Sequence, residues 1–312
     1  MLRQPINDLL GPARHILLTG CGGGYDVFGA VPLAIELLDA GREVVLANHS
    51  FCYLNGLDGA LQQPDCPNLY RVPPAAATED AYCPEAWLAR WFAEEHGRAL
   101  TMWGFDKTGV QPLQRALQSI VERHGVDAIV LIDGGIDALL RGDETSLGTP
   151  AEDLVFLAAA SALAVPRQVL ACVGFGAEQR DGICHDQVFG RIAELTRLNA
   201  FLGAAALLPQ TRPGQLYRAA VEYTFAHQQQ RKRSHVHEVV SAAVAGEFGP
   251  RGPHTWLSPL LALYWFFDLP TVAKTHLFLD HLRDSDDIWQ VNARIEAFRK
   301  SLSVRDRSAI PI

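Results

Sequence analysis

Residues 15–41 read HILLTGCGGGYDVFGAVPLAIELLDAG, and this stretch decides the fold class. A short apolar run leads into a cluster of glycines, and a longer apolar segment with helical spacing follows. This alternation is repeated along the chain: strand-like runs lie at 15–20, 43–51, 128–135, 169–176 and 204–209, and helical patterns at 31–41, 84–97, 111–125, 150–165 and 186–203. We therefore predict an α/β fold, a Rossmann-like, doubly wound, mostly parallel sheet with helices on both faces.

The alternation of strand-like runs and helical segments is interrupted in two parts of the chain. Residues 52–83 contain several prolines and no regular period, which predicts an irregular insertion or lid after the second strand. After residue 210 the strand-like runs fade, and the apolar segment 259–269 is expected to be a helix like its neighbours. The predicted organisation is a Rossmann-like domain over residues 1–210, followed by a helical C-terminal portion, residues 211–312, packed on the same domain.

Composition narrows the class of protein. The formal net charge of −8 argues against a nucleic-acid surface, and the basic run at 228–233 is expected to be an exposed helix end or loop. No apolar run reaches the roughly 20 residues that span a bilayer, so no membrane partner is expected. The six cysteines are scattered without a paired motif, as in a cytosolic protein with reduced thiols. We expect a cytoplasmic protein.

The glycine cluster has the general form of an anion-binding loop, because glycine backbones approach a ligand closely at a helix start. It matches neither common fingerprint. The third glycine of the dinucleotide pattern is missing, and Ala30 and Val31 stand where a P-loop needs lysine and a hydroxyl residue. The loop is expected to bind ligand through a set of residues completed by the end of the second strand: Gly22, Gly23, Gly24, Tyr25, Asp26, Asn48 and His49. Asp26 is a candidate catalytic residue or a helix cap.

A second loop, residues 133–153, is rich in carboxylates. Asp133 ends an apolar strand and Asp137 follows it, so the two are candidate catalytic residues or ligands for Mg²⁺ or another divalent cation. Gly134, Gly135 and Arg141 are candidate ligand-binding neighbours. Thr149-Pro150-Ala151-Glu152 has the form of a helix capping box, which predicts that Glu152 and Asp153 only start the next helix.

A third loop, residues 174–186, repeats the order of strand, glycines and polar residues. Glu178 is a candidate ligand-binding residue, and His185 is the preferred general acid or base because imidazole titrates near neutral pH. The histidines at 235 and 237 fall on different faces of a helix, which argues against a metal box. In a doubly wound sheet these three loops should meet at one edge and form one pocket.

The chain also resembles the domain of unknown function 1152 family of archaeal and bacterial proteins. The resemblance lies in the stretches GCGGGYDVFGAVPLA (20–34), DGGIDALLRGDE (133–144), GTPAEDL (148–154), GFGAEQRDGICH (174–185) and YWFFDL (264–269). It implies a shared architecture and carries no assigned reaction, so it transfers no catalytic role to any residue.

These observations favour an enzyme, a hydrolase or transferase that acts on a nucleotide, nucleoside or sugar-phosphate-like metabolite. The expected partner is a small polar or phosphorylated molecule. The sequence does not decide whether the protein forms a homo-oligomer. Two alternatives remain: a noncatalytic ligand sensor or complex partner, and an atypical nicotinamide-dependent oxidoreductase.

Overall fold

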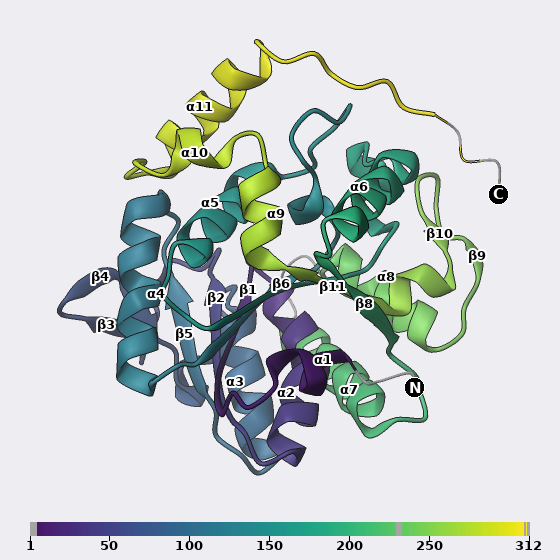
Figure 1. The fold of residues 1–312 in the computed structure, drawn as a ribbon. Coiled ribbons are helices and arrows are strands. Elements are labelled where there is room, and N and C mark those ends of the chain that lie inside the picture. The colour runs from purple at the N-terminus through teal and green to yellow at the C-terminus, as the bar shows by residue number, and fades with distance from the viewer. Residues whose placement is uncertain (1–4, 229–232, 309, 311–312) are drawn as a thin grey trace.

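The computed structural model describes residues 5–228, 233–308 and 310, and a single large sheet organises them (Figure 1). The sheet has nine strands in the order β3-β4-β5-β2-β1-β6-β7-β11-β8. Its centre is parallel and consists of β5 (Thr101–Phe105), β2 (Glu43–His49), β1 (His15–Gly20), β6 (Ala128–Asp133) and β7 (Arg167–Val173). The predicted α/β, doubly wound, mostly parallel fold is confirmed.

Helices cover both faces of the sheet, because successive strand residues point to opposite sides and both sides are apolar. In β1, Leu17 packs with one helix layer, whereas Ile16 and Leu18 pack with the other. The first layer holds α4 (Val110–His124), α5 (Pro150–Ser161), α6 (His185–Arg197), α9 (Leu269–Thr275), α10 (Leu279–Leu282) and α11 (Ile288–Arg299). The second holds α1 (Pro5–Leu10), α2 (Ala30–Asp39), α3 (Pro84–Glu94), α7 (Arg212–His227) and α8 (His235–Val244).

The sheet continues beyond residue 210. Residues 259–269 were expected to be helical, but β11 (Leu263–Asp268) runs antiparallel between β7 and β8 (Phe201–Ala206). The prediction was wrong because a short aromatic run fits a strand as well as a helix. In the structure Tyr264 and Phe266 enter one core layer while Trp265 and Phe267 pack against the other, which is the period of a strand. The C-terminal portion therefore contributes a strand as well as helices.

Two further segments differ from expectation. The insertion at 52–83 contains the strands β3 (Leu61–Gln63) and β4 (Cys66–Arg71), which extend the sheet antiparallel to β5. The helical pattern at 186–203 is divided, since α6 ends at Arg197 and β8 begins at Phe201. A small hairpin, β9 (Gly249–Pro250) with β10 (Trp256–Leu257), lies apart from the main sheet. The basic run at 228–233 lies mostly outside the described residues.

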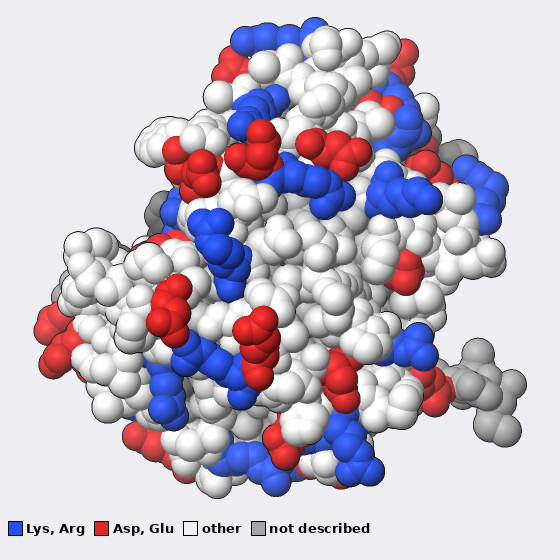
Figure 2. Space-filling model, turned by 60° about the vertical axis from the view of Figure 1, so that its left-hand side comes forward, with Lys and Arg blue, Asp and Glu red and all other residues white. Residues whose placement is uncertain are grey.

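No helix among the described residues has the length and apolar character needed to cross a membrane. On the face of the molecule shown in Figure 2, basic and acidic side chains are interspersed between larger neutral areas.

Candidate active site

The strand order places a crevice at the carboxyl edge of the sheet. The chain moves outward from β1 through β2 to β5 and then returns to β6 on the other side of β1, so the order reverses between β1 and β6. Ligands of open α/β sheets bind at this switch point. A cavity of about 290 Å³ lies there, lined by Gly22, Gly23, Asp26, Phe51, Asp133, Gly134, Asp137, Thr149, Glu152, Asp153, Ala177, Glu178, Arg180, Asp181, His235 and Val236.

Five carboxyl groups dominate this cavity, and we call them the carboxylate cluster: Asp26, Asp133, Asp137, Asp153 and Glu178. They come from the loops after β1, β6 and β7 and from the first turn of α5. Asp133, Asp137 and Asp153 expose only 3%, 7% and 2% of their surface, and the other two are partly exposed. Charged groups are rarely buried to this degree without paired opposite charges, so the cluster needs a chemical explanation.

The glycine loop holds Asp26 in place. The Gly22 N–H donates to Asp26 Oδ2 at 2.6 Å, and the Gly23 and Gly134 amides also hydrogen-bond this carboxylate. A Cβ added at Gly134 would lie 2.6 Å from Asp26 Oδ1, so only glycine permits this approach. The expectation that Gly22 and Gly23 present free amides to a substrate anion is therefore not met, because a carboxylate of the protein occupies them.

The other members of the cluster are held mainly by backbone amides from the second loop. The N–H groups of Ala138, Thr149 and Ile136 donate to Asp133 Oδ2, Asp137 Oδ2 and Glu178 Oε2 at 3.1, 2.9 and 2.7 Å. Asp153 differs from them: among the described residues no backbone amide is seen to donate to its carboxyl group, and burial and the charges of neighbouring carboxylates dominate its pKa. Asp153 is therefore the member least committed to holding the loops together.

Burial raises the pKa of every member of the cluster. For Asp133, Asp153 and Glu178 desolvation comes first, and repulsion from Asp137 adds to it, so the pKa of each lies well above its usual value. Desolvation raises the pKa of Asp26 to about 7, although the Gly22 amide opposes the shift. Asp26 therefore titrates near neutral pH, and burial favours the protonated form of the other members of the cluster.

Asp137 interacts with two other members of the cluster, Glu178 and Asp153. Burial raises the pKa of Asp137, whereas its side-chain interactions with Glu178 and Asp153 lower it, and the interaction with Asp137 raises the pKa of Glu178. Neighbouring carboxyl groups that interact in this way titrate together, so their protons belong to the set and not to one residue.

These raised pKa values predict a pH dependence of stability. An unfolded aspartate titrates near pH 4, so between about pH 4 and 7 folded Asp26 binds a proton that the unfolded chain lacks. This stabilisation is complete below pH 4 and is lost as the pH rises through 7. We expect the free energy of unfolding, measured with urea, to fall from pH 5 to pH 8. A rise in stability over this range would contradict the assignment, and Asp26→Asn should reduce the slope.

Few positively charged side chains lie near the carboxylate cluster to balance its negative charge. Arg180 lines the cavity and is exposed, and it pairs with Asp181. Glu152 forms an ion pair with Lys107. Burial and the charge of Arg180 lower the pKa of His235, so its imidazole is neutral at pH 7. The cavity wall therefore carries an excess of carboxyl groups over cations.

The start of α5 differs from the predicted capping box. Thr149 makes no side-chain cap hydrogen bond, and its hydroxyl lies 3.4 Å from Asp137 Oδ2 instead. Glu152 pairs with Lys107, and Asp153 points into the cavity. Glu152 and Asp153 lie in the first turn of α5 as predicted, but the capping box does not form, because the Thr149 N–H donates to Asp137 and Glu152 pairs with Lys107. Both acidic residues also line the cavity.

The remaining predicted ligand residues lie outside the cavity wall. Asn48 is fully buried and donates to the Gly24 carbonyl at 2.7 Å, and His49 packs beneath Gly23, so both support the glycine loop from below. Tyr25 is buried in the core, where it accepts a hydrogen bond from Gln228, and Arg141 forms ion pairs with Asp143 and Glu194. Gly135 lies behind Glu178, where an added Cβ would clash with the carboxyl group.

The expectation that His185 shares the pocket of Asp26 and Asp133 is wrong. His185 begins α6, and its ring packs 5.0 Å from that of Phe175. It lines a neighbouring cavity of about 590 Å³ together with Cys184, Asp186 and residues near the C-terminus. The histidine that lines the carboxylate cavity is His235, from the first turn of α8.

Sequence reasoning missed several cavity residues: Phe51, Thr149, Glu152, Asp153, Asp181 and His235. The sequence feature that could have identified most of them is their position, either within a few residues of the end of a parallel strand or at the start of the following helix. The predicted divalent site on Asp133 and Asp137 gains no support from the side-chain geometry, since no group of three or more His, Cys, Asp or Glu residues in the described ranges is arranged to hold a metal ion.

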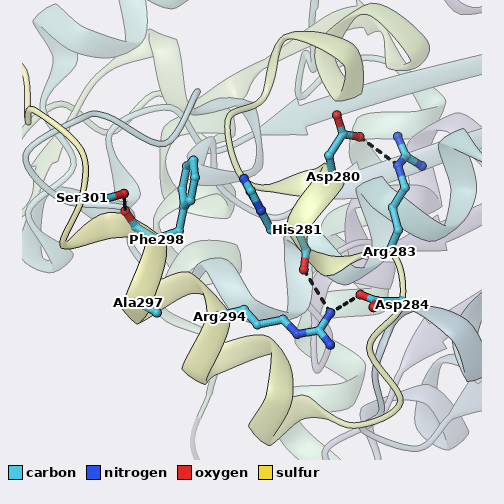
Figure 3. Close-up of a pocket in the computed structure, with 8 residues that line it drawn as sticks. All are labelled: Asp280, His281, Arg283, Asp284, Arg294, Ala297, Phe298 and Ser301. Carbon is cyan, nitrogen blue, oxygen red and sulfur yellow. Dashed lines mark hydrogen bonds and ion pairs between the residues drawn. The ribbon is translucent and has the colours of Figure 1, made fainter.

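A larger hollow of about 710 Å³ lies between α10 and α11 (Figure 3). Its charged side chains are paired with one another, Arg283 with Asp280 and Arg294 with Asp284. The carboxylate cavity is the stronger candidate for the active site, because it lies at the switch point of the sheet and contains almost fully buried carboxyl groups.

Comparison with known proteins identifies the family of this chain but no activity. No curated protein and no solved structure matches the chain significantly. The family described as "Protein of unknown function (DUF1152)" matches residues 93–300, about two thirds of the chain. The match includes the loops after β6 and β7 and strand β11, and it begins after the glycine loop. The chain belongs to the DUF1152 family.

Proposed function

We propose that this protein is an enzyme that carries out hydrolysis or group transfer on a small, hydroxyl-rich metabolite of the sugar or nucleoside type. The observation that carries the proposal is the convergence of five carboxyl groups on one cavity, three of them almost fully buried: Asp133, Asp137 and Asp153. Neighbouring carboxyl groups with different affinities for protons can act as base and acid in the same reaction. Asp137 would accept a proton from the attacking hydroxyl or water, and Glu178 would donate one to the leaving group.

The charge of the cavity favours an uncharged part of the substrate beside the cluster. Hydroxyl groups can donate to the carboxylates, whereas a phosphate would be repelled by them. The glycine-loop amides that would normally bind a phosphate already bind Asp26. A phosphorylated metabolite would have to direct its phosphate toward Arg180, at the exposed side of the cavity.

The two alternatives are less well supported. A nicotinamide-dependent oxidoreductase needs loop amides for the pyrophosphate and an acidic residue at the end of the second strand. Here Asp26 occupies the amides, and β2 ends in Asn48-His49, with Ser50 after it. A noncatalytic sensor needs only binding, and a group of buried carboxyl groups with raised pKa values has no evident use in it.

The test is a turnover screen. Purified protein is incubated with nucleosides, glycosides and sugar phosphates, and products are identified by liquid chromatography with mass spectrometry. We expect a cleaved or transferred product from a sugar-containing substrate, and Asp137→Asn should lower kcat by about 100-fold or more. Asp280→Asn, in the hollow between α10 and α11, is the matched control and should leave kcat unchanged.

Two outcomes would contradict the proposal. Saturable binding without any product would favour the sensor, and a product formed only with a nicotinamide cofactor would favour the oxidoreductase.

A further inference from the structure

An exposed aromatic ring lies in the wall of the carboxylate cavity. Phe51 follows β2 and exposes 52% of its surface. The described chain exposes other large apolar side chains, including Tyr53, Phe248 and Trp289, but Phe51 is the member of this exposed set that lines the cavity. Exposure of an aromatic ring forfeits burial energy, so its position beside the cluster suggests a use in binding.

The ring is held in a defined place. A Cβ added at Gly24 would lie 3.0 Å from Cδ2 and Cε2 of Phe51, so the ring packs directly on the glycine backbone. Gly24 has a φ of +61°, which also disfavours any other residue there. The His49 ring meets Phe51 edge-on, with centroids 5.5 Å apart. The ring is therefore positioned by the protein before any ligand arrives.

Lys107 links this ring to the cavity. Its Nζ lies 5.6 Å from the centre of the Phe51 ring, and the same ammonium group forms an ion pair with Glu152, a residue of the cavity wall. A lysine ammonium has three N–H donors, so it can bind a ring acceptor of a ligand as well as Glu152. Phe51 and Lys107 thus place an aromatic surface and a cation together, beside a wall that is otherwise acidic.

We propose that Phe51 stacks against a planar heterocycle of the substrate, which makes the substrate class a nucleoside: a flat base joined to a hydroxyl-bearing sugar. This inference rests on the proposed function and adds a planar base to the proposed sugar-containing substrate. The base lies on Phe51 with an acceptor toward Lys107, and the sugar extends toward Asp137 and Asp153. Neither a simple sugar nor a linear polyol would use the aromatic surface.

The experiment measures binding of three probes, adenosine, uridine and methyl β-ribofuranoside, by isothermal titration calorimetry. Because stacking of a base on an aromatic residue contributes about a factor of ten or more in affinity, Phe51→Ala should raise Kd for both nucleosides by about tenfold. The same change should leave Kd for methyl β-ribofuranoside unaltered. Phe51→Tyr keeps the ring and should restore nucleoside binding. Trp289→Ala removes an aromatic ring that is 80% exposed but outside the cavity, and it is the matched control.

The outcomes separate the inference from the proposed function. Binding of methyl β-ribofuranoside that depends on Asp137, with no gain from a base and no effect of Phe51→Ala, would overturn the inference and leave the proposed function standing. Equal weakening of all three probes by Phe51→Ala would also overturn it, since the ring would then only shape the cavity. Failure of all three to bind would overturn the nucleoside class, and the turnover screen would then decide the proposed function independently.

Discussion

Asp153→Asn is expected to lower kcat by about 100-fold or more and, at pH 8, to raise the thermal stability of the protein. The carboxyl group of Asp153 is 2% exposed, and burial and neighbouring carboxylates raise its pKa well above the usual value. Ionisation of this buried group therefore costs folding free energy, which a neutral amide of the same size avoids. The amide also cannot exchange a proton with Asp137, the proposed base, so the acid–base pair of Asp137 and Glu178 is impaired. We expect Tm at pH 8 to rise by about 2 °C or more.

Asp186→Asn is the matched control for this experiment. Asp186 also lies in the first turn of a helix that follows a parallel strand, but it lines the neighbouring cavity with His185. Its replacement should leave kcat unchanged. Unaltered turnover in Asp153→Asn, or a lower Tm at pH 8, would contradict the assignment of Asp153 to the acid–base site.

Gly134→Ala is expected to destabilise the fold by about 1–3 kcal/mol and to remove activity, although the change adds a single methyl group. That methyl would lie 2.6 Å from Asp26 Oδ1, so Asp26 must leave its amides or the loop after β6 must shift. Either movement separates carboxyl groups of the cluster. The measurements are urea denaturation and turnover of the substrate found in the screen.

Gly190→Ala provides the comparison. Gly190 lies within α6, and a Cβ added there would meet nothing within 4 Å. Alanine favours helix more than glycine does, so this variant should be stabilised by about 0.5–1 kcal/mol and remain active. Equal stability and activity of the two variants would show that Asp26 needs no close approach to Gly134.

The parallel part of the fold could be predicted because each buried strand is a short apolar run bounded by glycine or polar residues. β1, at His15–Gly20, has the predicted bounds. β11 could not be identified in this way, because Leu263–Asp268 is too short for its period to decide between helix and strand. Its place between β7 and β8 is decided by pairing with distant strands, which no local pattern contains.

The candidate site was predictable where a carboxylate lies at the end of a parallel strand or within five residues after it, as for Asp133, Asp137 and Glu178. Asp153 was missed because its local sequence satisfies a capping motif, and the competing partner, Asp137, lies 16 residues earlier in the chain. His185 was misplaced for a related reason. The direction of a side chain at a helix start depends on the packing of that helix, and in α6 the ring turns toward Phe175.

The position of β11 has a consequence for synthesis of the protein. Until Leu263–Asp268 leaves the ribosome, β7 has an open edge next to the loop that carries Glu178, and β8 has no neighbour in the sheet. Open strand edges pair readily with other chains, so a nascent or proteolysed form that stops near residue 210 should aggregate. The sheet is therefore completed only when the last fifth of the chain has been made, and fragments that end near residue 210 should fail to fold.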